Sequence, residues 1–201
     1  MNRSEFWIVA GINGAGKSTL VSKKDIRHVL GDIETLNPDL LVPRIQAELP
    51  HLDLTAANLE AARITEELVD QFIEDRRSFL VETVLSTRKY QDRIERARQQ
   101  GFLIGMIYVG LPTMELAVAR VADRRAAGGH DVPEEKIRSR WRRSLDNLAA
   151  FEPLVDRLLV FSNASPDGSV VLVAEKKDGR LCLFDSDALP EITRRLRPRL
   201  G

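Results

Sequence analysis

Residues 11–18 read Gly-Ile-Asn-Gly-Ala-Gly-Lys-Ser, which matches the phosphate-binding pattern G-x-x-x-x-G-K-[ST]. The apolar residues 6–10 come directly before this stretch, so a strand, a glycine-rich loop and a helix follow in the order that the pattern requires. Glycines let the backbone curl around phosphate groups, because no Cβ blocks close approach. The stretch therefore predicts a nucleoside triphosphate site, but it leaves the fate of the γ-phosphate open.

Each residue of this loop has an expected role. Lys17 can reach the β- and γ-phosphates as a point charge, and the Ser18 hydroxyl suits Mg²⁺, which prefers hard oxygen ligands. We expect the helix that follows to present its backbone N–H groups to the phosphates. The predicted ATP-binding residues are Gly11, Ile12, Asn13, Gly14, Ala15, Gly16, Lys17, Ser18 and Thr19, with Ser18 as the Mg²⁺ ligand.

Length and composition predict a single domain over residues 1–201. The chain carries 30 basic and 30 acidic side chains, so it lacks the uniformly basic character of a nucleic-acid binder. Its one cysteine, Cys182, fits a reducing compartment. We see neither a signal peptide nor an apolar run of membrane-spanning length, and we therefore expect a cytoplasmic protein without membrane contact.

Alternation of strands and helices predicts an α/β fold with a mainly parallel sheet. Residues 37–51 contain three prolines and are expected to form a broken loop. The predicted helices span residues 16–24, 55–77, 86 or 87 to about 100, 113–125, 132–150 and 187–196. Five strands are predicted at residues 5–10, 32–36, 78–84, 102–109 and 157–161, and a C-terminal β-hairpin within residues 168–186 turns at Asp178-Gly179.

Two acidic residues follow strands of this predicted sheet, whose carboxyl ends are where ligands bind in open α/β folds. Asp39 follows the second strand and is a candidate general base, close to the P-loop if that strand neighbours the first. An ordinary Asn-Pro-Asp turn is the alternative interpretation. Glu82 ends the third strand, where it could orient a Mg²⁺-bound water or bind substrate hydroxyls. A solvated strand end is its alternative, since burying a carboxylate without a partner is costly.

Arginines cluster within residues 120–125, directly before Gly128-Gly129. Arg120 and Arg124 lie four residues apart and therefore on one face of the predicted helix. Because arginine binds phosphate well and glycine pairs suit hinges, residues 118–150 are a candidate lid and following helix that bring these arginines over the phosphates. A solvated helix face is the alternative.

The ordered set of motifs resembles the zeta-toxin-like P-loop kinases, in a branch often labelled predicted ABC-type ATPase. The resemblance implies a three-layer kinase-like P-loop fold and ATP- and Mg²⁺-dependent phosphorylation of the sugar of UDP-N-acetylglucosamine, with a small antitoxin protein as a partner. It places Lys17, Asp39, Arg120 and Arg124 in the catalytic set. The segments that carry it are residues 11–19, Asn37-Pro38-Asp39, Glu82-Thr83-Val84-Leu85-Ser86, residues 120–133, residues 137–148 with Arg-Trp-Arg-Arg-Ser-Leu-Asp-Asn-Leu, and residues 163–165.

We expect the phosphate acceptor along residues 39–51 and 82–88. The predicted substrate-binding residues are Glu82, Thr83, Ser86 and Arg88. The chain departs from the better-known toxins in being shorter, and in having Gly128-Gly129-His130 where their second lid arginine is expected.

Two other functions stay open at this point. One is an ATPase or nucleotide-dependent switch that acts with a protein partner, although the chain has no Leu-Ser-Gly-Gly-Gln-like signature and no strand that ends in Asp-Glu. The other is a polynucleotide kinase-like enzyme. Zero net charge argues against a nucleic-acid partner, whereas the arginines within residues 138–143 argue for one.

Overall fold

The computed structural model describes residues 3–31, 33–129, 132–165 and 169–196. The strands form a single sheet in the order β2-β3-β1-β4-β5-β6-β7. Strands β1 to β5 are parallel, and β6 and β7 extend the sheet as an antiparallel hairpin. The predicted α/β fold, with five parallel strands and a C-terminal hairpin, is confirmed. The strands are β1 (Glu5–Ala10), β2 (Glu34–Leu36), β3 (Phe79–Thr83), β4 (Leu103–Gly110), β5 (Arg157–Ser162), β6 (Val171–Lys177) and β7 (Arg180–Leu183).

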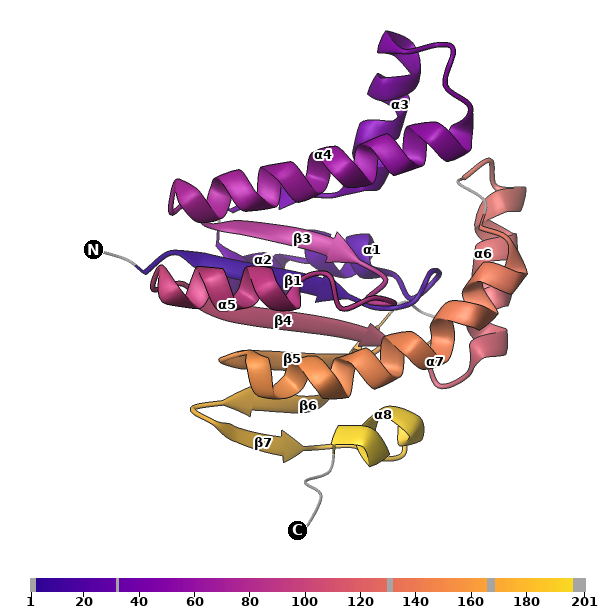
Figure 1. Ribbon diagram of the computed structural model, residues 1–201. Helices are drawn as coiled ribbons and strands as arrows, with labels where there is room; N and C mark the ends of the chain where they lie inside the picture. Colours follow the sequence, from indigo (N-terminus) through magenta and orange to yellow (C-terminus); the bar gives the residue numbers. More distant parts are fainter. Residues whose placement is uncertain (1–2, 32, 130–131, 166–168, 197–201) are drawn as a thin grey trace.

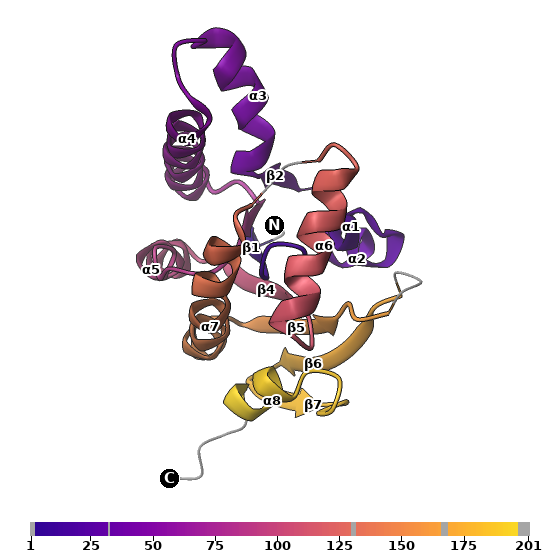
Figure 2. The same ribbon diagram turned by 90° about the vertical axis from the view of Figure 1, so that its right-hand side faces the viewer.

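Helices cover both faces of this sheet, which gives three layers (Figures 1 and 2). Helices α4, α5 and α7 lie on one face and α1 and α2 on the other, while α6 stands across the carboxyl ends of the strands. Within the described residues, no helix is both long and apolar enough to cross a membrane. The helices are α1 (Lys17–Ser22), α2 (Lys24–Leu30), α3 (Pro38–Glu48), α4 (Leu54–Glu74), α5 (Gln91–Gln99), α6 (Met114–Ala126), α7 (Glu134–Phe151) and α8 (Pro190–Leu196), with a 3₁₀ turn η1 at Glu152–Leu154.

The central strand β1 is fully buried along nearly its whole length. Residues 6–10 have no exposed surface, and the Phe6 ring stacks on Phe79 of β3 with centroids 4.4 Å apart. A parallel strand that is covered on both faces reads as a continuous apolar run, which explains why its position could be predicted. Burial of each large apolar side chain contributes about 1.5–3 kcal/mol. The P-loop therefore follows a strand that is buried along nearly its whole length.

The predicted broken loop over residues 37–51 is wrong for most of the segment, because α3 occupies it. Pro38 takes the first helical position, where a missing N–H costs nothing. Pro43 lies inside the helix and removes one helical hydrogen bond. Packing against α4 offsets that cost, and α3 projects away from the sheet at the N-terminal end of α4 (Figure 1). Their small separate core consists of Val42, Ile45, Ala57 and Ala61.

Two other helix boundaries differ from the predictions. The helix expected over residues 16–24 is divided, because α1 ends at Ser22 and α2 begins at Lys24. The helix expected to be capped by Ser86 or Thr87 begins only at Gln91. Residues 84–90 form a loop that ends in a turn, in which the Gln91 N–H donates to the carbonyl oxygen of Arg88 at 3.0 Å. By contrast, Thr113 caps α6 as predicted, since its Oγ1 accepts a hydrogen bond from the Leu116 N–H.

Candidate active site

The P-loop between β1 and α1 can adopt its path only because glycines stand at its tight points. Gly11 has a φ of 144°, and a Cβ there would lie 2.3 Å from the carbonyl oxygen of Val109 on β4. Gly14 has a φ of 82°, and a Cβ there would lie 2.7 Å from the carbonyl oxygen of Ala117 on α6. The loop is thus pressed against β4 and α6, with the first turn of α1 opening toward the site.

Glu82 at the end of β3 brings together the two functional side chains of the P-loop. The Ser18 hydroxyl donates to the Glu82 carboxylate at 3.0 and 3.1 Å from its two oxygens, and Lys17 Nζ lies 3.8 Å from Oε1. Asn37 Nδ2 donates to the same carboxylate at 3.0 Å. The side chains of Lys17 and Glu82 are each 11% exposed, so Glu82 is not a solvated strand end. It stands on the P-loop side of the site, where a carboxylate can orient a metal-bound water.

Four charged side chains, Glu82 among them, act on the ammonium group of Lys17. Burial lowers the pKa of Lys17 below its ordinary value. The carboxylates of Glu82 and Asp39 raise the pKa, while the guanidinium groups of Arg124 and Arg140 lower it. Two acids and two arginines therefore surround the lysine that the sequence assigns to the phosphates.

Asp39 reaches this cluster by a route that differs from the predicted one. Strand β2 does not neighbour β1, because β3 lies between them. Asp39 instead stands in the first turn of α3, where its backbone N–H donates to Asn37 Oδ1 at 2.9 Å. Since the other end of the Asn37 amide donates to Glu82, this one side chain fixes the start of α3 against the P-loop side of the site. Asp39 is close enough to Lys17 to affect its pKa.

Arg140 on α7 is the site residue that sequence reasoning missed. Its Nη1 donates to the side-chain oxygen of Asn13 in the P-loop at 3.3 Å. Arg140 thus brings a further arginine to the P-loop from a helix that follows the Gly128-Gly129-His130 segment. The sequence offered a weak signal, because Arg140 belongs to the run 137–148 that carries the family resemblance. Nothing in the sequence distinguished it from its neighbours Arg138, Arg142 and Arg143.

Arg120 and Arg124, which were expected to act together, occupy different parts of the site. Arg120 lines a pocket of about 260 Å³ on the far side of the P-loop from Glu82. Arg124 acts electrostatically on Lys17 and lies close above Gly129, where a Cβ would come within 2.7 Å of its Cγ. The chain past Gly129 includes His130 and Asp131, which lie outside the described residues. The lid therefore stays a prediction.

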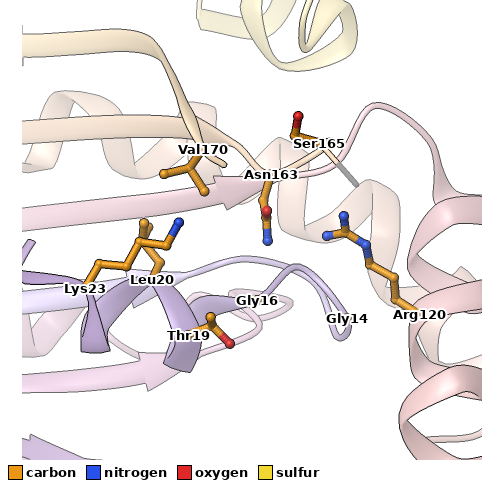
Figure 3. Close-up of a pocket in the computed structure, with 9 residues that line it drawn as sticks. All are labelled: Gly14, Gly16, Thr19, Leu20, Lys23, Arg120, Asn163, Ser165 and Val170. Atoms are coloured by element: carbon orange, nitrogen blue, oxygen red, sulfur yellow. The ribbon is translucent and has the colours of Figure 1, made fainter. Parts of the chain in front are cut away.

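The pocket beside Arg120 lies next to the P-loop, and one of its walls comes from residues that follow β5. Arg120 extends toward Asn163 across the pocket (Figure 3). Asn163 follows β5, and its Nδ2 donates to the carbonyl oxygen of Ala15 in the P-loop at 2.8 Å. Its Oδ1 is buried without a hydrogen-bond partner in the described part of the chain. The residues that line the pocket are Gly14, Gly16, Thr19, Leu20, Lys23, Arg120, Asn163, Ser165 and Val170.

The predicted acceptor-binding residues extend from the end of β3, which includes Glu82 and Thr83, into the loop before α5, which includes Ser86 and Arg88. Thr83 Oγ1 accepts a hydrogen bond from the Leu85 N–H at 3.1 Å, so it shapes the loop itself. Ser86 is half-buried in the same loop, and Arg88 is exposed. Arg88 Nε donates to the side-chain oxygen of Asn147 on α7 at 3.3 Å.

The residues available to a metal ion fit Mg²⁺ that arrives with a nucleotide. In the described part of the chain, no cluster of three or more His, Cys, Asp or Glu side chains could hold a metal by itself. The Ser18 hydroxyl and the Glu82 carboxylate nevertheless offer two hard oxygen ligands at one point. Mg²⁺ is usually bound in this way, through one or two protein oxygens plus the phosphates and water.

The fold and this site together define a P-loop protein of the kinase class, in which the central parallel strand leads through the glycine-rich loop into a helix. The chain belongs to the Zeta toxin family, whose model matches residues 2–188. The predicted family resemblance is thereby confirmed, and family membership supports the prediction that the chain is a kinase.

One relative and two solved structures are similar to this chain, and the solved structures share its fold. An uncharacterised protein of Haemophilus influenzae (strain Rd) is 28% identical over 149 residues, which cover 70% of this chain and all of that protein. The AvrRxo1-ORF1:ORF2 complex with ATP matches with a TM-score of 0.74 and 16% identity over 99% of this chain. This chain spans only 65% of the matched AvrRxo1 chain. A structure of the PezAT toxin–antitoxin system of Streptococcus pneumoniae matches with a TM-score of 0.68 and 16% identity, and covers all of this chain and 81% of the other.

Proposed function

We propose that the protein is an ATP- and Mg²⁺-dependent kinase that transfers the γ-phosphate to a hydroxyl group of a small molecule. A nucleotide-sugar of the UDP-N-acetylglucosamine type is the first candidate acceptor. One observation carries the proposal: Lys17, Ser18 and Glu82 are in contact, and Asp39, Arg124 and Arg140 lie close enough to influence Lys17. Phosphoryl transfer needs such positioned charges more than it needs covalent chemistry.

Each charge has a part in the proposed transfer. Asp39 accepts the proton of the acceptor hydroxyl while the hydroxyl oxygen attacks the γ-phosphorus. The bond to the β-phosphate oxygen breaks, and ADP leaves. Lys17, Arg124 and Arg140 stabilise the negative charge on the transferring group. Ser18 and Glu82 would hold the Mg²⁺ ion, which supplies further charge neutralisation when bound.

The arrangement of the arginines favours a small acceptor over a nucleic acid. Arg138 pairs with Glu134 at 2.7 Å, and Arg143 donates to the carbonyl oxygen of Ser139 at 3.0 Å. Arg140 turns to the P-loop. The arginines within residues 138–143 are therefore spread around α7 rather than aligned as a basic surface that could follow a phosphate backbone.

The similarity to a structure of the PezAT toxin–antitoxin system supports a small antitoxin protein as a partner. An ATPase or nucleotide-dependent switch is the alternative function, because an ATPase stimulated by a protein partner would use the same P-loop. The family resemblance supports a cytoplasmic location.

The test is phosphorylation of a nucleotide-sugar panel with ATP and Mg²⁺, followed by mass spectrometry. We expect a mass gain of one phosphoryl group, which Lys17→Ala and Asp39→Ala abolish. Asp75→Asn is the control, since Asp75 is an exposed carboxylate at the C-terminal end of α4. It precedes the start of β3, whereas the site lies at the carboxyl ends of the strands. Formation of only ADP and phosphate, strongly stimulated by a protein partner, would refute the kinase. Unchanged product formation by Asp39→Ala would refute the assignment of the base.

A further inference from the structure

The run Arg140-Trp-Arg-Arg-Ser144-Leu-Asp-Asn147-Leu on α7 contains two buried polar side chains that the proposed transfer does not use. Arg140, Ser144 and Asn147 are spaced i, i+4 and i+7, so they share one face of the helix. Ser144 is fully buried and Asn147 is 7% exposed. Most buried polar side chains are hydrogen-bonded, so the partners of these two show what this face of the helix contacts.

Both side chains bind the main chain directly after β3. Ser144 Oγ donates to the carbonyl oxygen of Val84 at 2.7 Å, and Asn147 Nδ2 donates to the carbonyl oxygen of Leu85 at 2.9 Å. The Tyr108 hydroxyl on β4 lies 2.9 Å from Ser144 Oγ. Helix α7 is therefore fixed to residues 84–85, which connect Glu82, beside the P-loop, with the predicted acceptor-binding residues Ser86 and Arg88.

This segment has an unfavourable backbone conformation. Leu85 has a φ of 59°, which costs a residue other than glycine about 1–2 kcal/mol. The N–H of Leu85 donates to Thr83 Oγ1, and its carbonyl accepts from Asn147. Such strain persists where the surroundings determine the conformation strongly, and it is concentrated at functional sites.

Asn147 also holds Arg88. The Asn147 oxygen accepts the Nε–H of Arg88 at 3.3 Å, and within the described residues it is the one hydrogen-bond partner that the Arg88 side chain has. Arg88 is exposed, and a guanidinium held at Nε keeps its two terminal nitrogens available for a bidentate contact with an anion. One amide thus determines both the path of the loop and the position of the arginine.

We propose that Asn147 is a positioning residue for the phosphoryl acceptor. It holds Leu85 in its left-handed conformation and holds Arg88 where that arginine binds an anionic group of the acceptor. Two turns earlier on the same helix, Arg140 contacts the P-loop, so α7 sets the acceptor side of the site relative to the ATP side. This inference rests on the proposed kinase function, and Asn147 itself touches neither the phosphates nor the reacting oxygen.

A double-mutant cycle in steady-state kinetics tests the inference, with UDP-N-acetylglucosamine as the acceptor probe. We expect Asn147→Ala to raise the acceptor KM about tenfold while kcat and the KM for ATP change by less than about twofold. Arg88→Ala should have a similar effect, and the double variant should raise the acceptor KM by much less than the product of the two single effects, because Asn147 acts partly through Arg88. Thr65→Val is the control, since Thr65 is a buried hydroxyl that binds a main-chain carbonyl in α4. Additive effects, or an equal loss for ATP and acceptor, would overturn the proposal.

A second measurement separates this inference from the proposed function. Hydrogen exchange of the free protein should be faster at residues 84–88 in Asn147→Ala and unchanged there in Thr65→Val. If the wild type fails to phosphorylate any nucleotide-sugar, the proposed acceptor class is wrong, whereas the exchange experiment still decides the role of Asn147. Unchanged exchange at residues 84–88 would overturn the positioning role by itself.

Discussion

Tyr108→Phe and Ser144→Ala each remove one hydroxyl group from a buried hydrogen-bonded chain. We expect the two substitutions to lower the free energy of unfolding by unequal amounts. The single hydroxyl proton of Ser144 is donated to the carbonyl oxygen of Val84, so Tyr108 is the donor in the contact between the two hydroxyls. Ser144→Ala leaves two polar groups without partners, the carbonyl oxygen of Val84 and the phenol of Tyr108. Each orphaned group costs about 1–3 kcal/mol, and Val84 is half-buried, so we expect a total of about 2–3 kcal/mol.

Tyr108→Phe is expected to cost less, because Ser144 still donates to Val84 and loses only an incoming hydrogen bond. That loss is worth about 1 kcal/mol. In the Ser144→Ala background, Tyr108→Phe should be neutral or should restore about 1 kcal/mol, since the phenol is then already orphaned. The two substitutions are therefore expected to be strongly non-additive.

Urea unfolding of the four proteins, followed by far-ultraviolet circular dichroism, gives the free energies of unfolding from midpoints and slopes. Ile104→Val on β4 is a control for small changes in core packing near Tyr108. The reasoning would be refuted if Tyr108→Phe destabilised the protein more than Ser144→Ala does. It would also be refuted by free energies that add.

Three further predictions concern the site and its charges. In steady-state kinetics, Arg120→Ala should raise the KM for ATP about tenfold with little change in kcat, whereas Arg124→Ala should mainly lower kcat, by about tenfold or more. The reverse pattern would exchange the roles of the two arginines. The protein should take up protons when it binds ATP at pH 9, because burial lowers the pKa of Lys17 in the free protein and the phosphates favour its charged form. Calorimetry in buffers of different ionisation enthalpy measures this proton uptake, and Lys17→Met should remove it. At pH 10 a free tyrosine is half ionised, but the folded protein should show little tyrosinate absorbance. The reason is that burial raises the pKa of both tyrosines, that of Tyr108 to about 12. Substantial tyrosinate in the folded state would contradict their burial.

Local pattern was enough to predict the elements on which the site is built. The P-loop is a contiguous motif, and residues 6–10 form the uninterrupted apolar run that a strand covered on both faces requires. Glu82 could be selected because a carboxylate directly after a buried strand needs a partner. Its partners proved to be Ser18, Asn37 and Lys17.

Features that depend on contacts distant in sequence could not be read from local pattern. The hydrogen bond from Arg140 to Asn13 joins residues 127 positions apart, and that from Asn163 to Ala15 joins residues 148 apart. The insertion of β3 between β2 and β1 is likewise a property of the assembled sheet. Helix α3 was missed because Pro43 is tolerated only through packing against α4, and no local rule includes that packing.

The pocket beside Arg120 is assembled from segments that are synthesised far apart in time. Its floor comes from the P-loop and α1, whereas Asn163, Ser165 and Val170 on the opposite wall follow β5. A growing chain thus carries its P-loop early, but this pocket, which we propose holds part of the nucleotide, lacks a wall until the segment leading to β6 has left the ribosome. Nascent chains that have been translated only as far as β5 should therefore bind ATP weakly, and the capacity for tight ATP binding should appear late in translation.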